Sequence, residues 1–322
     1  MKPVQRLLVA LLMLFTFVSL ACQSATNLVI TPTPTASLTP TITLTPTRTP
    51  RPTKTFTPTP TPLVIRVDHM HKVRSGGFEF PVFDGMKTEI SNHDAFMYSK
   101  NEKLNVYLSG QVPYPGEHVN TTLKYYMEWA NKQFRNVTEG ERETFTHAGA
   151  DGAGMFFSGL TKDGEPFQAR VAFLRPEGGK MLTLLVYAYG EGAWDEFGQQ
   201  AYQTTLDKVT FFEITSWEGC SISTDPAYGF SERKPVLLGG ELLLGPDREE
   251  DYMSALLGKD GGVVFYSRID TVEVNGKTLD KYILRVGNGG SKTLFIDLYH
   301  AGPVQVPSGM TCSSPLPARL DN

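Results

Sequence analysis

Motifs that mark the common catalytic and metal-binding families are missing from this sequence of 322 residues. There is no Gly-x-Ser-x-Gly, no His-Glu-x-x-His, no phosphate-binding loop and no calcium loop of EF-hand spacing. Each absence excludes one family of proteins, and none of them excludes catalysis as such. We therefore predict no catalytic, metal or cofactor-binding residue and no cofactor, and we keep an enzyme as the less favoured alternative.

Acidic residues are also missing from the first 67 positions, which contain six Lys or Arg. The rest of the chain holds the other 24 of the 30 basic residues and all 34 acidic ones. An acidic folded part repels phosphate backbones, so we expect no nucleic-acid partner. A solvated acidic surface that keeps the protein in solution explains this charge better than a cation-binding patch does.

Cysteine is scarce, with only Cys22, Cys220 and Cys312. Cys22 ends an apolar leader, which leaves one cysteine at each end of the C-terminal part. In an oxidising compartment these two would form a disulfide. It would close a loop of about 90 residues, for which the chain-entropy model gives at most roughly 4–5 kcal/mol. The alternative is two buried, unpaired thiols.

Residues 1–22 have the organisation of a bacterial signal peptide. Lys2 and Arg6 precede an apolar run from Leu7 to Leu20, which is too short to span ~30 Å of hydrocarbon comfortably as a helix. Ser19-Leu20-Ala21-Cys22 resembles the lipobox of bacterial lipoproteins, although Ser19 departs from the usual Leu. The resemblance implies a lipid anchor on Cys22. Ordinary cleavage and an uncleaved anchor stay open as alternatives.

A Thr/Pro-rich segment follows over residues 23–63, with near alternation from Thr31 to Pro62. Proline removes backbone donors, threonine disfavours helix, and almost nothing apolar is available for burial. We predict a disordered stalk that reaches at most about 100 Å as polyproline II. At the other end of the chain, residues 315–322 are predicted to be a tail.

The first folded region is predicted over residues 64–215, with short strands and two helices. A strand begins at Gly76 and stops at Pro81. Apolar residues recur at helical spacing from Val119 to Phe134, and we expect this stripe to be core. Turns that contain Gly separate three later strands. The other predicted strands are Ala95–Tyr98, Leu104–Ser109, Ala153–Leu160, Phe167–Leu174 and Met181–Tyr189, and the second helix is Trp194–Leu206.

This order of elements resembles the PsbP-like fold. The resemblance depends on Gly76-Gly77-Phe78-Glu79-Phe80-Pro81, the strands and helices after it, and the closing Leu206-Asp207-Lys208-Val209-Thr210-Phe211. It implies an α+β fold in which an antiparallel sheet packs between helices, and a binding role rather than catalysis. No ligand residue can be transferred, because the family shares no site motif.

The second folded region is predicted over residues 216–314 as a small β-rich domain closed by the Cys220–Cys312 disulfide. One helix begins at Pro246, with Tyr252, Met253, Leu256 and Leu257 on its apolar face, and ends at Gly258. Asn275-Gly276 indicates a type I′ hairpin. The remaining predicted strands are Pro235–Leu238, Leu242–Leu244, Val263–Ile269, Thr271–Val274, Tyr282–Val286 and Thr293–Tyr299. The region resembles a module of exported bacterial proteins for which no activity is known.

Three sets of side chains are weak candidates for a site. Asp225, Tyr228 and Glu232 suit a binding surface, although a turn with a packed tyrosine is the better explanation. His69 and His71 could bind a metal, but a solvated linker end is favoured. Asp297 and His300 could form an acid–base pair, against a capped strand end.

Together these patterns predict a cell-envelope lipoprotein on the outer face of the cytoplasmic membrane or the cell surface. Its favoured role is a non-catalytic binding or assembly module for an unknown protein, glycan or small molecule. The alternatives are an envelope enzyme of unrecognised class and a structural spacer. Because the connection Glu213–Gly219 is short, the number of independently folding domains stays open.

Overall fold

The computed structural model describes residues 65–113, 117–239, 245–286 and 290–318. The predicted signal peptide, the lipidation at Cys22 and the stalk lie outside the described residues. Residues Pro62–Asn322 form one compact unit, in which mainly antiparallel sheets combine with a few helices. The predicted α+β fold is therefore confirmed.

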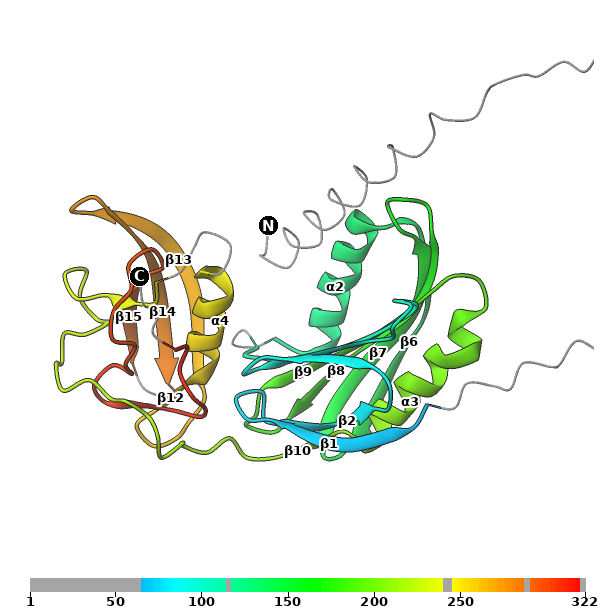
Figure 1. Cartoon of the computed structure of the whole chain (residues 1–322), viewed down its shortest axis with the longest axis horizontal. Helices are drawn as coiled ribbons and strands as arrows, with labels where there is room; N and C mark the ends of the chain where they lie inside the picture. The colour runs from blue at the N-terminus through cyan, green and yellow to red at the C-terminus, as the bar shows by residue number, and fades with distance from the viewer. Residues whose placement is uncertain (1–64, 114–116, 240–244, 287–289, 319–322) are drawn as a thin grey trace, which may run out of the picture. The chain divides into compact units, whose positions relative to one another are not determined.

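A seven-stranded antiparallel sheet is the centre of the first lobe, residues 65–215 (Figure 1). Its strand order is β3-β4-β5-β9-β8-β7-β6. The predicted hairpins join β7, β8 and β9, and β9 then pairs with β5. The strands are β3 (Lys87–Ile90), β4 (Asp94–Tyr98), β5 (Leu104–Gln111), β6 (Arg135–His147), β7 (Ala150–Leu160), β8 (Pro166–Pro176) and β9 (Met181–Tyr189).

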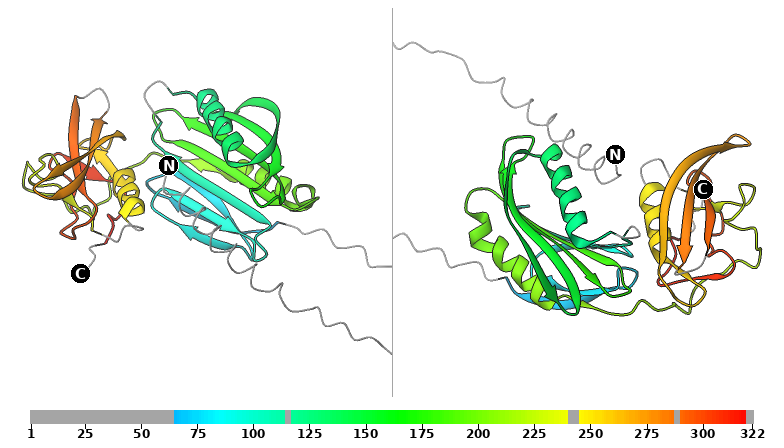
Figure 2. Two further views of the ribbon diagram at one scale, coloured as in Figure 1. Left: turned by 90° about the horizontal axis from the view of Figure 1, so that it is seen from above. Right: turned by 180° about the vertical axis from the view of Figure 1, so that it is seen from behind.

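Helix α2 (Val119–Gln133) covers one face of this sheet (Figure 2). Its buried residues follow the predicted spacing and are Val119, Leu123, Met127 and Ala130. Beneath it lie the odd-numbered side chains of β7, β8 and β9, because alternate residues of a strand point to opposite faces. Many of these side chains are aromatic, among them Phe157, Phe167, Phe173 and Tyr187.

The even-numbered side chains of the same strands face a second layer. Leu182, Leu184 and Val186 of β9 share one apolar cluster with Phe78 and Trp194. The predicted second helix is present, but its first turn is π-helical. The layer consists of β1 (Val67–Val73), β2 (Phe78–Phe83), β10 (Thr210–Phe211), the π-turn η1 (Trp194–Gly198) and α3 (Gln199–Lys208).

Two predictions about the start of the first lobe are wrong. The segment of His69 and His71, expected as a linker end, is the edge strand β1 of the three-stranded sheet β1-β2-β10. Strand β2 continues through Pro81 to Phe83. β10 pairs only with Phe78 and Glu79 of β2. At Pro81, one side of β2 therefore has no strand partner, and sheets tolerate proline where a strand is unpaired on one side.

Strand β6 was not predicted. It is the edge of the large sheet and is mostly exposed, so its polar sequence lacks the apolar alternation that marks a strand. Its charges and two register shifts are features that protect an edge strand from pairing with other chains.

The second lobe, residues 216–318, contains a four-stranded sheet of order β11-β15-β14-β13. Helix α4 (Gly245–Ala255) lies beside this sheet (Figure 1). Its Tyr252 and Met253 belong to the apolar cluster of the second lobe. Asn275 and Gly276 have φ values of 51° and 76°, as the predicted type I′ turn requires. The strands are β11 (Val236–Leu237), β13 (Val264–Val274), β14 (Lys277–Val286) and β15 (Ser291–Asp297), with β12 (Leu256–Gly258) and β16 (Met310–Cys312) as a separate pair.

The second lobe also corrects the sequence analysis. Leu256 and Leu257 do not continue the helix but form β12, which pairs with β16 from the far end of the region. β13 is one strand with an irregularity between Arg268 and Asp270, where two strands were predicted. The predicted strand Leu242–Leu244 lies outside the described residues.

A disulfide joins Cys220 to Cys312, with 5.8 Å between their Cα atoms. The bond ties the start of the second lobe to β16. A disulfide of this kind fits an exported protein, because thiols stay reduced in the cytosol. In the described ranges of the chain, no helix has the length and apolar character needed to cross a membrane.

Candidate functional site

The acidic members of the predicted binding surface do not meet. Asp225 Oδ1 accepts the N–H of Ala227 at 3.0 Å, and Asp225 Oδ2 lies 2.5 Å from Lys234 Nζ. Lys234, and then the Ala227 N–H, lower the pKa of Asp225. Glu232 is exposed and forms no hydrogen bond or ion pair with Asp225 in the described part of the chain. The Asp225 contacts are those of a turn.

Tyr228, the third member, is a packed turn residue. Its hydroxyl donates to Pro303 O at 3.0 Å and accepts the N–H of Gln305 at 3.1 Å. Both contacts tie the turn to the loop after β15. The side chain therefore has a structural use, and a binding role for the three residues stays a prediction.

Asp297 and His300 lie in contact at the end of β15. Asp297 Oδ1 accepts the N–H groups of Tyr299 and His300 at 2.9 and 3.0 Å. His300 Nδ1 lies 2.8 Å from Asp297 Oδ2, and Lys277 Nζ lies 3.6 Å from it. The Asp297 side chain is fully buried. This is the capped strand end that the sequence analysis favoured.

His69 and His71 lie on the same face of β1 with ring centroids 6.5 Å apart. His69 Nδ1 is 2.9 Å from Asp68 Oδ2, whereas the His71 ring packs against Phe80. Burial, and then the neighbouring His69, lower the pKa of His71. Within the described ranges no three His, Cys, Asp or Glu side chains are arranged to hold a metal ion.

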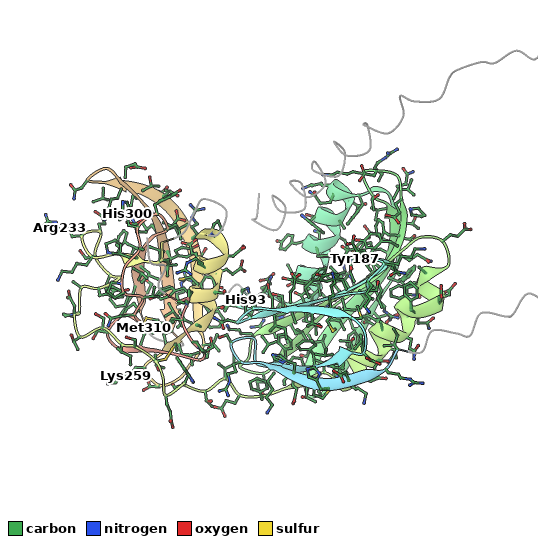
Figure 3. The ribbon with its side chains drawn as sticks, in the orientation of Figure 1. His93, Tyr187, Arg233, Lys259, His300 and Met310 are labelled. Carbon is green, nitrogen blue, oxygen red and sulfur yellow. A yellow bond between two sulfur atoms is a disulfide. The ribbon has the colours of Figure 1, made fainter. Side chains whose placement is uncertain are left out.

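A charged cluster that the sequence analysis did not single out connects the corner before β4 with helix α4 (Figure 3). His93 is 5% exposed, and its Nε2 lies 3.3 Å from Asp94 Oδ2 and 3.5 Å from Glu250 Oε1. Its Nδ1 lies 3.5 Å from Asp251 Oδ1 and 3.3 Å from Ser254 Oγ. With one further lysine, these residues form the junction cluster: His93, Asp94, Lys180, Glu250, Asp251 and Ser254.

The carboxylates of the junction cluster keep His93 charged. Burial by itself lowers the pKa of His93. Close contact with Asp251 and Glu250, and the charge of Asp94, outweigh burial and raise this pKa to about 10. Burial also raises the pKa of Asp94, although His93 opposes that change. At neutral pH, His93 is therefore an imidazolium.

Lys180 is the second cation of the cluster and comes from the turn before β9. It is 3% exposed, and its Nζ donates to the backbone O of Ser254 at 2.8 Å. Burial lowers the pKa of Lys180 to about 7, although the charge of Asp94 acts in the opposite direction. The first lobe therefore supplies both His93 and Lys180 to the end of α4.

Ser254, His93 and Asp94 contact one another in the same order as the nucleophile, the base and the acid of a catalytic triad. A serine is activated only when the imidazole can accept its proton. The pKa of about 10 keeps that proton on His93. Ser254 is also 2% exposed, so a substrate has no access to it. The arrangement suits an ion-paired contact rather than acyl transfer.

Hydroxyl groups extend this contact between the lobes. Ser75 Oγ lies 2.8 Å from both Ser313 Oγ and Ser314 Oγ, and all three side chains are buried. Asn92 Nδ2 donates to Pro315 O at 3.1 Å. We call these residues and the junction cluster together the junction.

A second buried ionic group lies inside the second lobe, on the opposite side of α4. Glu249 is 6% exposed and Asp280 is 7% exposed. Asp280 Oδ1 accepts from Arg268 Nη2 at 2.5 Å and from Thr271 Oγ1 at 3.0 Å. Burial, and then the charge of Asp280, raise the pKa of Glu249 to about 8. At neutral pH the Glu249 carboxyl is therefore mostly neutral beside Asp280.

A depression of about 400 Å³ lies on the first lobe beside Ile65. Two of its polar residues bond to each other: Ser99 Oγ donates to Asn101 Oδ1 at 2.7 Å, and it accepts the N–H of Leu104 at 3.0 Å. Its apolar residues are Ile65, Phe83, Met86, Leu104 and Phe197, and its other residues are Asp84, Gly85, Ser99, Lys100 and Asn101.

Sequence comparison adds no assignment: no protein-family model matches the chain, and no curated protein matches it. Solved structures that resemble it include cyanobacterial PsbP from Synechocystis sp. PCC 6803, at 14% identity and TM-score 0.36, covering 45% of this chain and 92% of that one. The Ran-binding protein Mog1p of Saccharomyces cerevisiae has 8% identity, TM-score 0.36, and coverage of 46% and 96%.

LpqN, which is involved in cell envelope biogenesis of Mycobacterium tuberculosis, has 14% identity and TM-score 0.33, with coverage of 42% of this chain and 83% of that one. The first of the three belongs to the family that the sequence of the first lobe resembles.

Proposed function

We propose that this chain is an exported, membrane-anchored binding or assembly module without catalytic activity, and that a protein partner inserts apolar side chains into the depression beside Ile65. The observation that carries the proposal is the depression itself. Its volume of about 400 Å³ lies within the range of sites that hold ligands. Ile65, the first residue that the structure describes, is part of its lining.

The contacts around the depression favour a protein partner. Ser99 Oγ donates to Asn101 Oδ1, so the side-chain donors and acceptors left for a ligand are mainly those of Asp84, Lys100 and the Asn101 amide nitrogen. A glycan needs many such groups for its hydroxyls, whereas apolar side chains gain from burial alone. The leader with Cys22 and the Cys220–Cys312 disulfide support export, and the charged state of His93 supports a role without general-base catalysis.

Photo-crosslinking in intact cells tests the proposal. A photoreactive residue at position 100, in place of Lys100, should crosslink to a protein partner. Met86→Glu places a charge inside the depression and should reduce that product about tenfold or more, with an unchanged thermal melt. Met70→Glu is the matched control, because Met70 is 38% exposed on β1 and does not line the depression.

Two results would contradict the proposal. One is a crosslinked product that Met86→Glu and Met70→Glu reduce equally. The other is a thermal shift of the full-length protein with a sugar that Met86→Glu abolishes, since the depression would then hold a glycan.

A further inference from the structure

The contact between the two lobes differs in composition from the interior of either lobe. The buried apolar clusters of the first lobe end at Val209, and that of the second begins at Val236, so no described cluster crosses the junction. The junction buries polar side chains instead: Ser75, His93, Lys180, Ser254, Ser313 and Ser314. Polar contacts of this kind gain little net free energy, because water solvates the same groups when the surfaces separate.

We propose that the junction is a contact that opens, and that charged His93 keeps it closed by pairing with the carboxylates of α4. Loss of this charge would separate the two lobes while each lobe keeps its own apolar core. The junction would then be a hinged contact between the two lobes, and its opening does not depend on which ligand the depression binds.

The charges around His93 explain why it would control the contact. Glu250 and Asp251 of helix α4 contact His93. Asp247 of the same helix lies near enough that the charges of Glu250, Asp251 and His93 change its pKa. β4 contributes Asp94, whose Oδ2 accepts from the Tyr107 hydroxyl of β5 at 3.1 Å. The carboxylates therefore come from both sides of the contact.

Without the charge of His93, Asp94 of the first lobe would repel Glu250 and Asp251 of the second lobe, although Arg248 of α4 partly offsets the charge of Asp251. Lys180 is the other cation of the cluster, but its Nζ donates to the backbone O of Ser254 and burial disfavours its charge. The side chains of Asp94, Glu250 and Asp251 are 26%, 42% and 30% exposed, so solvent screens their repulsion only in part. Opening would hydrate these groups.

The chain between the lobes is short and lacks regular structure. Ile214 is buried in the first lobe, where it lies against Gly77, and the Trp217 N–H donates to Cys312 O at 2.7 Å in the second. Thr215 and Ser216 between them are exposed and belong to no helix or strand. A few such residues suffice for a hinge, because they can change φ and ψ without loss of packing.

Labelling of Lys180 in the full-length protein tests the proposal. An amine-reactive reagent is applied at one pH, and modification of Lys180 is measured relative to exposed Lys162 by mass spectrometry. His93→Gln should raise this ratio about a hundredfold, the size expected when one partner of a buried ion pair is removed. His69→Gln is the matched control, because it removes an exposed imidazole paired with Asp68.

A change in amine basicity would act against the expected result. The charge of Asp94 raises the pKa of Lys180. Without the positive charge of His93 beside it, Asp94 would raise the pKa of Lys180 further. A more protonated amine reacts more slowly. Faster labelling in His93→Gln would therefore report exposure.

A reporter on the other side of the junction distinguishes separation of the lobes from local motion of the turn before β9. Ser254→Cys, alone and combined with His93→Gln, is labelled with a maleimide. Separation exposes both positions, so both labelling rates should rise together. Faster labelling of Lys180 alone, or no change at either position with an unchanged circular dichroism spectrum, overturns the proposal.

If His93→Gln does not fold, Asp251→Asn replaces it. This substitution removes one of the carboxylates that face His93. Because the Asp251 side chain is 30% exposed, the variant is expected to fold. It should also raise Lys180 labelling, by a smaller factor. Labelling equal to that of the wild type would again overturn the proposal.

Discussion

The two lobes differ in what stabilises them. The first lobe buries apolar side chains on both faces of its large sheet, and many of those under α2 are aromatic. Among its described residues, the second lobe has one apolar cluster, a disulfide, and a carboxyl pair buried under helix α4. The comparison indicates that the first lobe depends mainly on burial of apolar surface, whereas the second depends also on a covalent bond and on the protonation of one carboxyl group.

The largest expected effect is on the aromatic face of the first lobe. Phe157→Ala should lower the free energy of unfolding of this lobe by about 4 kcal/mol, because Phe157 is completely buried and its removal leaves a cavity. A urea titration that follows each lobe by hydrogen exchange measures the change. Tyr125→Ala on α2, where the side chain is 59% exposed, is the control and should have little effect. Equal loss in both lobes would show that they unfold as one unit.

Removal of the disulfide should affect the other lobe. Cys220→Ser with Cys312→Ser should destabilise the second lobe by about 3 kcal/mol, since the bond closes a loop of 92 residues. The first lobe should keep its melting temperature. Thermal melts of the double variant, compared with the wild type under reducing and oxidising conditions, measure this difference. A lower melting temperature of the first lobe as well would contradict the comparison.

The buried carboxyl pair should make the second lobe sensitive to alkaline pH. The pKa of Glu249 rises from 4.5 to about 8 on folding, so its neutral form contributes stability that is complete below pH 4.5. This contribution falls as pH rises toward 8 and is lost above it. Glu249→Gln stays neutral, so the variant should become more stable than the wild type by on the order of 2 kcal/mol between pH 5 and pH 9.

Urea titrations at several pH values measure the effect of Glu249→Gln. Glu273→Gln, on an exposed position of β13, provides the control for the loss of one carboxylate. If the two variants have the same pH profile, the Glu249 carboxyl is ionised in the folded protein.

The smallest expected effect concerns the β13–β14 turn. Gly276 has φ 76°, and nothing lies within 4 Å of a Cβ placed there, so Gly276→Ala is strained only in its backbone. We expect a loss of about 1 kcal/mol. Gly262→Ala has equal space without a positive φ and should cost less. Equal melting temperatures for the two variants would argue against a type I′ turn.

The candidate site was much harder to predict than the fold. The hairpins of β7, β8 and β9 and the stripe of α2 follow from local period and turn residues, and these predictions are confirmed. Asp225, Tyr228 and Glu232 are candidates because polar and aromatic residues on a loop suit a binding surface, but Asp225 and Tyr228 serve the turn and the loop that it contacts. β6 and β12 were missed because an exposed edge and a three-residue strand carry no apolar period.

The sequence alone predicted a leader with Cys22 and a Thr/Pro segment, which lie outside the described residues, and it predicted the Cys220–Cys312 pairing and the α+β class, which the structure confirms. The first three predictions depend on local composition or on elimination among three cysteines, whereas the α+β class came from the order of elements and its resemblance to a known fold. Only the tertiary structure brought His93 and Lys180 to Glu250, Asp251 and Ser254. Each of these residues is ordinary in its own segment. The pKa values of His93 and Lys180 depend on burial and on charges more than seventy positions away in the chain, which no local pattern encodes.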